Sequence, residues 1–228
     1  MMLFAFLACC ALLAFFLLVQ KVNENSWGSE QNLRGVDVDS NASTSIDADI
    51  PLDTSQASQE TVTLMTSQGD IIISLRPNQS PDSVQYIKAL LDSPKPCKKC
   101  RLYRAEQRGI LQGILAKEGV APNEVLGNCP LSPEELEEYR QEDEENANAA
   151  CHGPIMTRGM VGWAAGEGGP DFFIDYYEKP ADWWGHDHTV FGEIVDQTSL
   201  DIVKGFFDLP AHRDGLMFLD EPVSIELK

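Results

Sequence analysis

Cysteine residues are the side chains of this 228-residue sequence whose type and spacing most directly suggest chemistry. Two of the six cysteines lie in an apolar N-terminal segment, and the others are Cys97, Cys100, Cys129 and Cys151. A Cys-x-x-Cys pair followed by two more cysteines is compatible with a zinc site, with His152 as a spare ligand, or with thiol redox chemistry. The later cysteines form no second Cys-x-x-Cys pair, and no clear helix start follows Cys100. We therefore favour disulfides Cys97–Cys100 and Cys129–Cys151, with other pairings open, and predict no metal or cofactor.

A second region of interest is the aromatic-rich stretch of residues 170–195, PDFFIDYYEKPADWWGHDHTVFGEIV. Each aromatic ring buries a large apolar area, so these side chains are not expected to form a solvated loop. The alternating His186 and His188 are more typical of a loop than of a metal site. Taken alone, the stretch predicts a β-rich core segment.

Arg104 and Gln112 are polar residues within an apolar-rich stretch, residues 102–116, that predicts a short pair of strands. A guanidinium group stays charged and presents a rigid set of donors. Because side chains alternate with period two along a strand, both residues would share one face if the strands were uninterrupted. The simplest interpretation of Arg104 alone is a surface arginine on a strand.

The elements that must position these residues begin with a predicted β-hairpin over residues 61–77, where two strand-like runs flank Gln68-Gly69. A helix follows, with Ser80 as its N-cap, proline in its first turn, and an end before Pro94. Its apolar residues at positions 84, 87 and 91 lie on one face, which predicts packing against the sheet.

An acidic helical insert is predicted near residues 130–150. Ser132 and Glu135 can form a capping box. The residues after them are polar on nearly all sides, so this helix is expected to be exposed. A helical turn over residues 200–207 and a last strand over residues 222–227 complete a pattern typical of a β-barrel or a compact α+β domain.

The N-terminal part differs from the rest in composition. Residues 1–20 are uncharged and long enough to span a bilayer, which predicts a transmembrane signal-anchor, with a cleaved signal peptide as the alternative. Residues 21–60 are polar and acidic, and predict a disordered stem. Sequons at Asn41 and Asn78 and the four cysteines favour an endomembrane protein (ER or Golgi) whose domain, residues 61–228, faces the lumen. The net charge of −19 argues against a nucleic-acid partner.

Four segments, in order, resemble the cyclophilin family of peptidyl-prolyl isomerases over roughly residues 62–227. They read MTSQGDIIISL, LYRAEQRGILQG, PDFFI and HDHTVFGEIV. The resemblance implies a mainly β fold, a cyclophilin-like closed antiparallel β-barrel of about eight strands with capping α-helices, here with an N-terminal transmembrane helix. It also implies isomerisation of X-Pro bonds in proline-containing peptide or protein clients.

The resemblance further implies roles for individual residues. Arg104 matches the family's catalytic arginine, and Gln112 matches a glutamine that orients this arginine and the substrate carbonyl. The implied substrate-binding residues are the apolar wall Ile110, the pocket floor Phe173, the rim tryptophan Trp183, the neighbouring His188, and Asp171 and Ala164.

Three positions depart from the family's usual pattern. Gly109 stands where an aromatic side chain is usual, Asp171 where a glutamine is usual, and Tyr103 where a histidine is usual. A carboxylate at Asp171 could form an ion pair with Arg104 and weaken its pull on the prolyl nitrogen. The departures suggest low isomerase activity, and the alternatives are a peptide-binding module without turnover or, from the cysteines, a metal- or redox-active lumenal protein.

Overall fold

The computed structural model describes residues 60–228, apart from residues 123–124, 143–148 and 165–168. The predicted transmembrane segment and nearly all of the predicted stem lie outside these residues. Within the described part of the chain, no helix has the length and apolar character needed to cross a bilayer.

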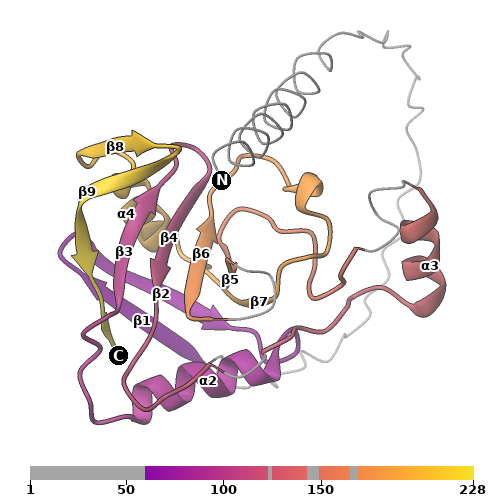
Figure 1. The fold of residues 1–228 in the computed structure, drawn as a ribbon, viewed down its shortest axis with the longest axis horizontal. Helices are drawn as coiled ribbons and strands as arrows, with labels where there is room; N and C mark the ends of the chain where they lie inside the picture. The colour runs from indigo at the N-terminus through magenta and orange to yellow at the C-terminus, as the bar shows by residue number, and fades with distance from the viewer. Residues whose placement is uncertain (1–59, 123–124, 143–148, 165–168) are drawn as a thin grey trace, which may run out of the picture. The chain divides into compact units, whose positions relative to one another are not determined.

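A single antiparallel sheet organises the domain (Figure 1). Its order is β10-β1-β2-β7-β5-β6-β4-β3-β9-β8. The strands are β1 (Thr61–Thr66), β2 (Gly69–Leu75), β3 (Arg101–Ala105), β4 (Ile110–Ile114), β5 (Met160–Trp163), β6 (Asp171–Asp175), β7 (Val190–Glu193), β8 (Ala211–Asp214), β9 (Leu216–Ser224) and β10 (Glu226–Leu227).

The sheet curls because one C-terminal segment pairs with two strands, β3 and β1, that lie far apart in the strand order of the sheet. Val223 of β9 lies opposite Leu102 of β3, whereas Leu227 of β10 lies opposite Leu64 of β1. Between them, the Ile225 N–H donates to the carbonyl of Cys100 at 3.0 Å. The prediction of a mainly β fold is confirmed, but the sheet of the described residues has ten strands where about eight were predicted, and the predicted last strand is divided between β9 and β10.

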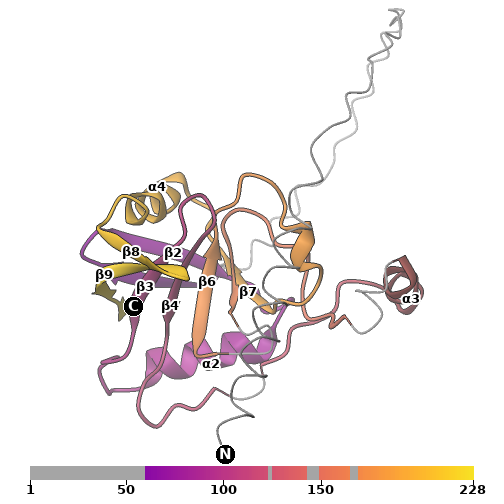
Figure 2. The ribbon, with the colours of Figure 1, turned by 45° about the horizontal axis from the view of Figure 1, so that its top comes forward.

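Two helices cover the sheet from opposite sides, α2 (Pro81–Asp92) and α4 (Gln197–Phe206), as Figure 2 shows. The predicted cap of α2 is confirmed, since the Ser80 hydroxyl accepts from the Ser83 N–H at 3.4 Å. On its apolar face Leu90 is fully buried, whereas Leu91, which the sequence predicted to face the sheet, is only partly buried. The predicted helical turn is part of the longer α4, capped by Asp196.

The predicted acidic insert contains α3 (Pro133–Glu142), which lies apart from the sheet (Figures 1 and 2). The capping box forms as expected: Glu135 accepts from the Ser132 N–H at 2.8 Å, and Ser132 accepts from the Glu135 N–H at 3.2 Å. The helix buries no residue. A disulfide between Cys129 and Cys151 joins the two ends of the insert.

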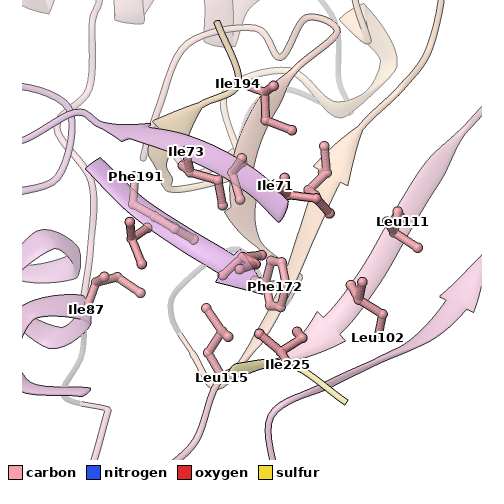
Figure 3. Close-up of a cluster of buried hydrophobic side chains, with 14 of the residues drawn as sticks. Ile71, Ile73, Ile87, Leu102, Leu111, Leu115, Phe172, Phe191, Ile194 and Ile225 are labelled. Atoms are coloured by element: carbon pink, nitrogen blue, oxygen red, sulfur yellow. The ribbon is translucent and has the colours of Figure 1, made fainter. Parts of the chain in front are cut away.

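The side chains of β6 alternate between two apolar clusters, the larger of which is the main core (Figure 3). Phe172 and Ile174 of β6 are fully buried in it beside Leu111 of β4. Phe173, between them in the chain, points to the other face, because successive strand side chains alternate. There it joins a second, smaller cluster with Ile110, Met156, Ala181 and Val190.

Candidate functional site

The β3–β4 hairpin brings Arg104 and Gln112 together. The two residues lie directly opposite each other in the register of this antiparallel pair. The chain turns between them, where the Gly109 N–H donates to the carbonyl of Glu106 at 2.9 Å. The prediction that both share a face is therefore confirmed, but cross-strand pairing causes it, and not alternation along one continuous strand.

The Arg104 guanidinium is held by two side chains. Its Nη1 donates to Gln112 Oε1 at 2.7 Å, and its Nε lies 3.4 Å from Glu106 Oε1. The side chains of Arg104 and Glu106 are 19% and 20% exposed, so this ion pair is largely shielded from solvent. The arrangement leaves Arg104 oriented by Gln112 and partly neutralised by Glu106.

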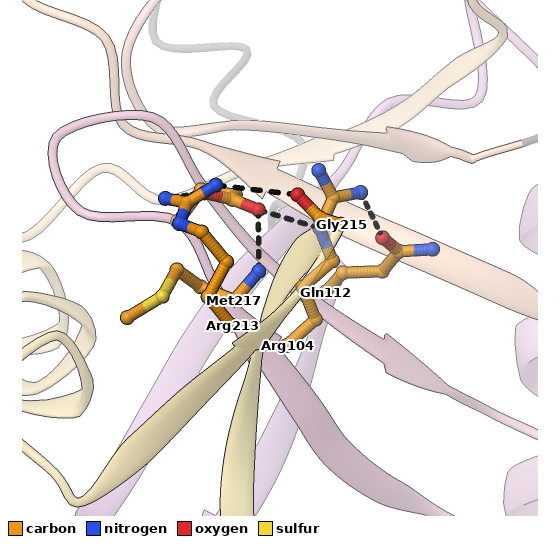
Figure 4. Close-up of polar contacts among 6 residues, drawn as sticks. Arg104, Gln112, Arg213, Gly215 and Met217 are labelled. Atoms are coloured by element: carbon orange, nitrogen blue, oxygen red, sulfur yellow. Dashed lines mark hydrogen bonds and ion pairs between the residues drawn. The ribbon is translucent and has the colours of Figure 1, made fainter.

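The β8–β9 hairpin fixes Glu106 through Arg213 and Met217, which are labelled in Figure 4. Its Oε1 accepts from the Met217 N–H at 2.7 Å, and its Oε2 lies 3.7 Å from Arg213. The sequence suggested that Asp171 could form an ion pair with Arg104, but Asp171 instead accepts from the Tyr103 hydroxyl at 2.8 Å. These two departures from the family pattern therefore satisfy each other, because a phenol donates well to a carboxylate.

A cavity of about 270 Å³ lies on the face that Arg104 shares with Phe173. Six of the predicted site residues line it: Arg104, Ile110, Gln112, Ala164, Phe173 and His188. Asp171 and Trp183 do not belong to its lining. Trp183 is 61% exposed and contacts the lining only from outside, through Tyr177 and Trp184, which places it near the rim.

Aromatic rings form the apolar part of the cavity. The ring of Phe173 meets the ring of Trp184 edge-to-face at 5.3 Å between centroids, and that of His188 at 5.0 Å. Burial lowers the pKa of His188, although its hydrogen bond with the Trp163 carbonyl opposes the shift. The imidazole is therefore neutral at neutral pH, which leaves Arg104 as the cation among the lining residues.

Two lining residues, Trp184 and Tyr177, were not named as site residues from the sequence. Tyr177 has a recoverable signal, because it shares the parity of Phe173 and follows it by four residues along the strand direction. Trp184 lies in the short helix η2 (Asp182–Trp184), whose ends sequence patterns do not fix. Its neighbour Trp183 was the more obvious candidate from the resemblance alone.

The four cysteines are paired as Cys97–Cys100 and Cys129–Cys151. The thiolates that a zinc site would need are therefore engaged in disulfides. Within the described residues, no group of three histidine, cysteine or acidic side chains is arranged to hold a metal ion.

A larger cavity, of about 1030 Å³, lies between the β1–β2 turn and β9, away from Arg104. Its lining includes Asp220, Glu221 and Glu226 with prolines and small polar residues. No arginine, lysine or histidine is among those lining residues. The larger cavity therefore does not combine a cation with an aromatic floor, as the smaller cavity does.

The fold and the smaller cavity define a domain that presents a fixed cation beside an aromatic pocket. Residues 61–225 match the family described as cyclophilin-type peptidyl-prolyl cis-trans isomerase. The chain belongs to this family.

One solved structure supports the fold, and two others are similar at lower scores. The crystal structure of a cyclophilin-type isomerase from Cryptosporidium parvum aligns with a TM-score of 0.50 and 17% identity, over 74% of this chain and 95% of that one. The same protein in the presence of the dipeptide Ala-Pro gives 0.49, 18%, 74% and 97%. A cyclophilin from Hirschia baltica gives 0.47, 15%, 75% and 73%. A comparison with curated protein sequences gives no match.

Proposed function

We propose that the described domain catalyses cis–trans isomerisation of X-Pro peptide bonds. The observation that carries this proposal is the placement of Arg104, held by Gln112, in the lining of the cavity that contains Phe173. Membership of the family supports the same activity.

The chemistry needs only binding and charge placement. Rotation about a peptide bond faces a barrier of about 18–20 kcal/mol, because the nitrogen lone pair is delocalised into the carbonyl. As the bond twists, the lone pair returns to the prolyl nitrogen, which then becomes a good hydrogen-bond acceptor. With the proline ring against Phe173, a donor from Arg104 would stabilise this nitrogen mainly in the transition state. No covalent intermediate is required.

The groups around Arg104 are consistent with its role as the donor to the prolyl nitrogen. Gln112 keeps one guanidinium nitrogen occupied and so limits the rotation of Arg104. The neutral imidazole of His188 adds no second positive charge that would compete for the same acceptor. The aromatic floor contacts the proline ring in either isomer. Lowering of the rotation barrier therefore depends on the Arg104 guanidinium.

A protease-coupled isomerisation assay on residues 60–228 tests the proposal. We expect Arg104→Ala to lower kcat/KM by about a hundredfold or more, because it removes a transition-state donor. Arg101→Ala is the matched control, since Arg101 lies on the same strand outside the cavity lining. If the wild-type domain and Arg104→Ala both leave the uncatalysed rate unchanged, the proposed activity is wrong.

One observation favours a second candidate, a binding module without useful turnover. Glu106 lies 3.4 Å from Arg104 and withdraws part of the positive potential on which the mechanism depends. Titration of the domain with an Ala-Pro peptide, followed by tryptophan fluorescence, distinguishes the two candidates. Saturable binding together with absent turnover would support the binding module.

We also propose that the domain acts on secretory-pathway clients from a membrane anchor formed by residues 1–20. The two disulfides support an oxidising compartment. Alkaline extraction and protease protection of microsomes containing the full chain would test this: we expect the chain in the membrane pellet and the domain protected. Recovery in the soluble fraction, or digestion of the domain in intact microsomes, would contradict it.

A further inference from the structure

The strongest chain-specific feature of the cavity is the contact between Gly109 and Tyr177. A Cβ atom placed on Gly109 would lie 3.1 Å from both Cζ and the hydroxyl oxygen of Tyr177. Such a distance is shorter than ordinary van der Waals contact, so a side chain at 109 requires the Tyr177 ring to shift from its present position. The backbone of Gly109 does not have the positive φ that would itself demand glycine.

We propose that Tyr177 supplies an aromatic wall to the cavity in place of the aromatic side chain that is usual at the position of Gly109. The aromatic side chain then comes from a residue after β6 and not from the residue before β4. Glycine at position 109 fits this arrangement, because the Tyr177 ring occupies the space that a side chain at 109 would need. The inference rests on the proposed function for its substrate class, and it assigns Tyr177 a specificity-determining role.

Backbone hydrogen bonds and two indole rings hold Tyr177 in place. Its own N–H donates to Asp175 Oδ1 at 2.8 Å, and the preceding Tyr176 N–H donates to the Gly109 carbonyl at 2.7 Å. The ring meets Trp183 edge-to-face at 4.9 Å and Trp184 at 5.5 Å between centroids. A wall fixed by backbone hydrogen bonds and two indoles can contact a ligand without losing much conformational entropy.

The polar tip of Tyr177 distinguishes this wall from a phenylalanine. Burial, followed by the charges of Asp175 and Glu106, raises the pKa of Tyr177, while Arg104 opposes the shift. The phenol therefore stays protonated at neutral pH and adds a neutral donor to the cavity lining. Contacts of this kind act on bound substrate and transition state alike, so Tyr177 should affect KM more than kcat.

A mutant cycle between positions 109 and 177 tests the inference. We expect Tyr177→Ala to raise KM for a chromogenic Ala-Pro peptide about tenfold through loss of the ring wall. Gly109→Phe alone should also lose activity, because its side chain meets the tyrosine ring. The double variant Gly109→Phe/Tyr177→Ala should return KM to within about threefold of the wild type, a strongly non-additive result. Additive losses, or a wild-type KM for Tyr177→Ala, would overturn the inference.

Controls separate this inference from misfolding and from failure of the proposed function. Tyr139→Ala, in α3 and outside the cavity lining, should leave turnover unchanged, and urea midpoints of all variants identify those that fail to fold. Tyr177→Leu keeps most of the volume and serves if the alanine variant unfolds; its KM should still rise. If wild-type turnover is absent, the same cycle measured by Ala-Pro peptide binding decides the matter: rescue in the double variant supports the relocated wall, and its absence refutes it.

Discussion

The two faces of β6 differ in what their side chains do. Phe172 and Ile174 are completely buried in the main core, and Ile174 lies opposite Leu111 of β4. Phe173, one position away, belongs to a small cluster that borders a cavity open to ligands. One five-residue strand therefore faces the closed main core on one side and the cavity of the proposed site on the other. The difference teaches that substitutions at adjacent positions should separate stability from binding.

Asp175 is the exception on the cavity face. It has the parity of Phe173, but it does not line the cavity, its side chain is fully buried, and one carboxylate oxygen has no hydrogen-bond partner among the described residues. The other oxygen accepts from the Tyr177 N–H and so fixes the start of the aromatic wall.

Paired alanine substitutions at Phe172 and Phe173 test the comparison with the largest expected effect. Phe172→Ala should lower the free energy of unfolding by about 3–5 kcal/mol, because it leaves a cavity in closed packing. Phe173→Ala should cost about half as much, since its cluster borders a cavity already, but it should abolish measurable binding of an Ala-Pro peptide. Urea unfolding and peptide titration give both quantities. Equal losses of stability with binding retained in Phe173→Ala would contradict the division between faces.

Asp175→Asn sharpens the comparison through pH. Burial raises the pKa of Asp175 to about 6, although the Tyr177 N–H opposes the shift. Because the folded state then holds its proton more tightly than the unfolded state, the stability from this group is complete below about pH 4. It falls as pH rises through about 6, by roughly 3 kcal/mol in total.

The amide keeps the acceptor for Tyr177 without a titrating charge. We therefore expect Asp175→Asn to be more stable than wild type at pH 8, with the difference gone at pH about 4. Unfolding measured at several pH values in both proteins checks the sign. A difference that grows toward acid would refute the buried, proton-retaining carboxyl.

Glu106→Gln probes the rim of the cavity face and should have the smallest effect. Glutamine keeps the acceptor for the Met217 N–H but removes the negative charge beside Arg104. We expect kcat/KM to rise by about threefold at low salt, and the gain to shrink as salt screens the pair. Steady-state kinetics at two ionic strengths measure this change. A slower enzyme would show instead that Glu106 positions Arg104 more than it weakens it.

Local sequence signals predicted the regular elements well. Ser80 with Pro81, and Ser132 with Glu135, mark the starts of α2 and α3 because capping depends on residues within one turn. The hairpin around Gly69 follows for the same reason. The splitting of the last strand at Ile225 did not follow, because it depends on pairing with strands distant in the sequence.

The candidate site was predicted less completely, for an electrostatic and a geometric reason. The acid beside Arg104 is Glu106 and not Asp171, because the β8–β9 hairpin fixes Glu106 while Tyr103 engages Asp171. The lining includes Tyr177 because Gly109 leaves room for it. Both outcomes depend on which side chains of distant segments meet, and periodicity within one segment carries no such information.

Residues 216–227 pair with both β3 and β1, and this has a consequence for synthesis of the protein. A ribosome makes β1 first and must finish this late segment before the earliest strand can acquire its partner Leu227. The half-made domain therefore exposes an unpaired strand edge during translation, a state in which nascent chains commonly recruit chaperones. A cell that makes this domain would therefore have to protect it while it folds.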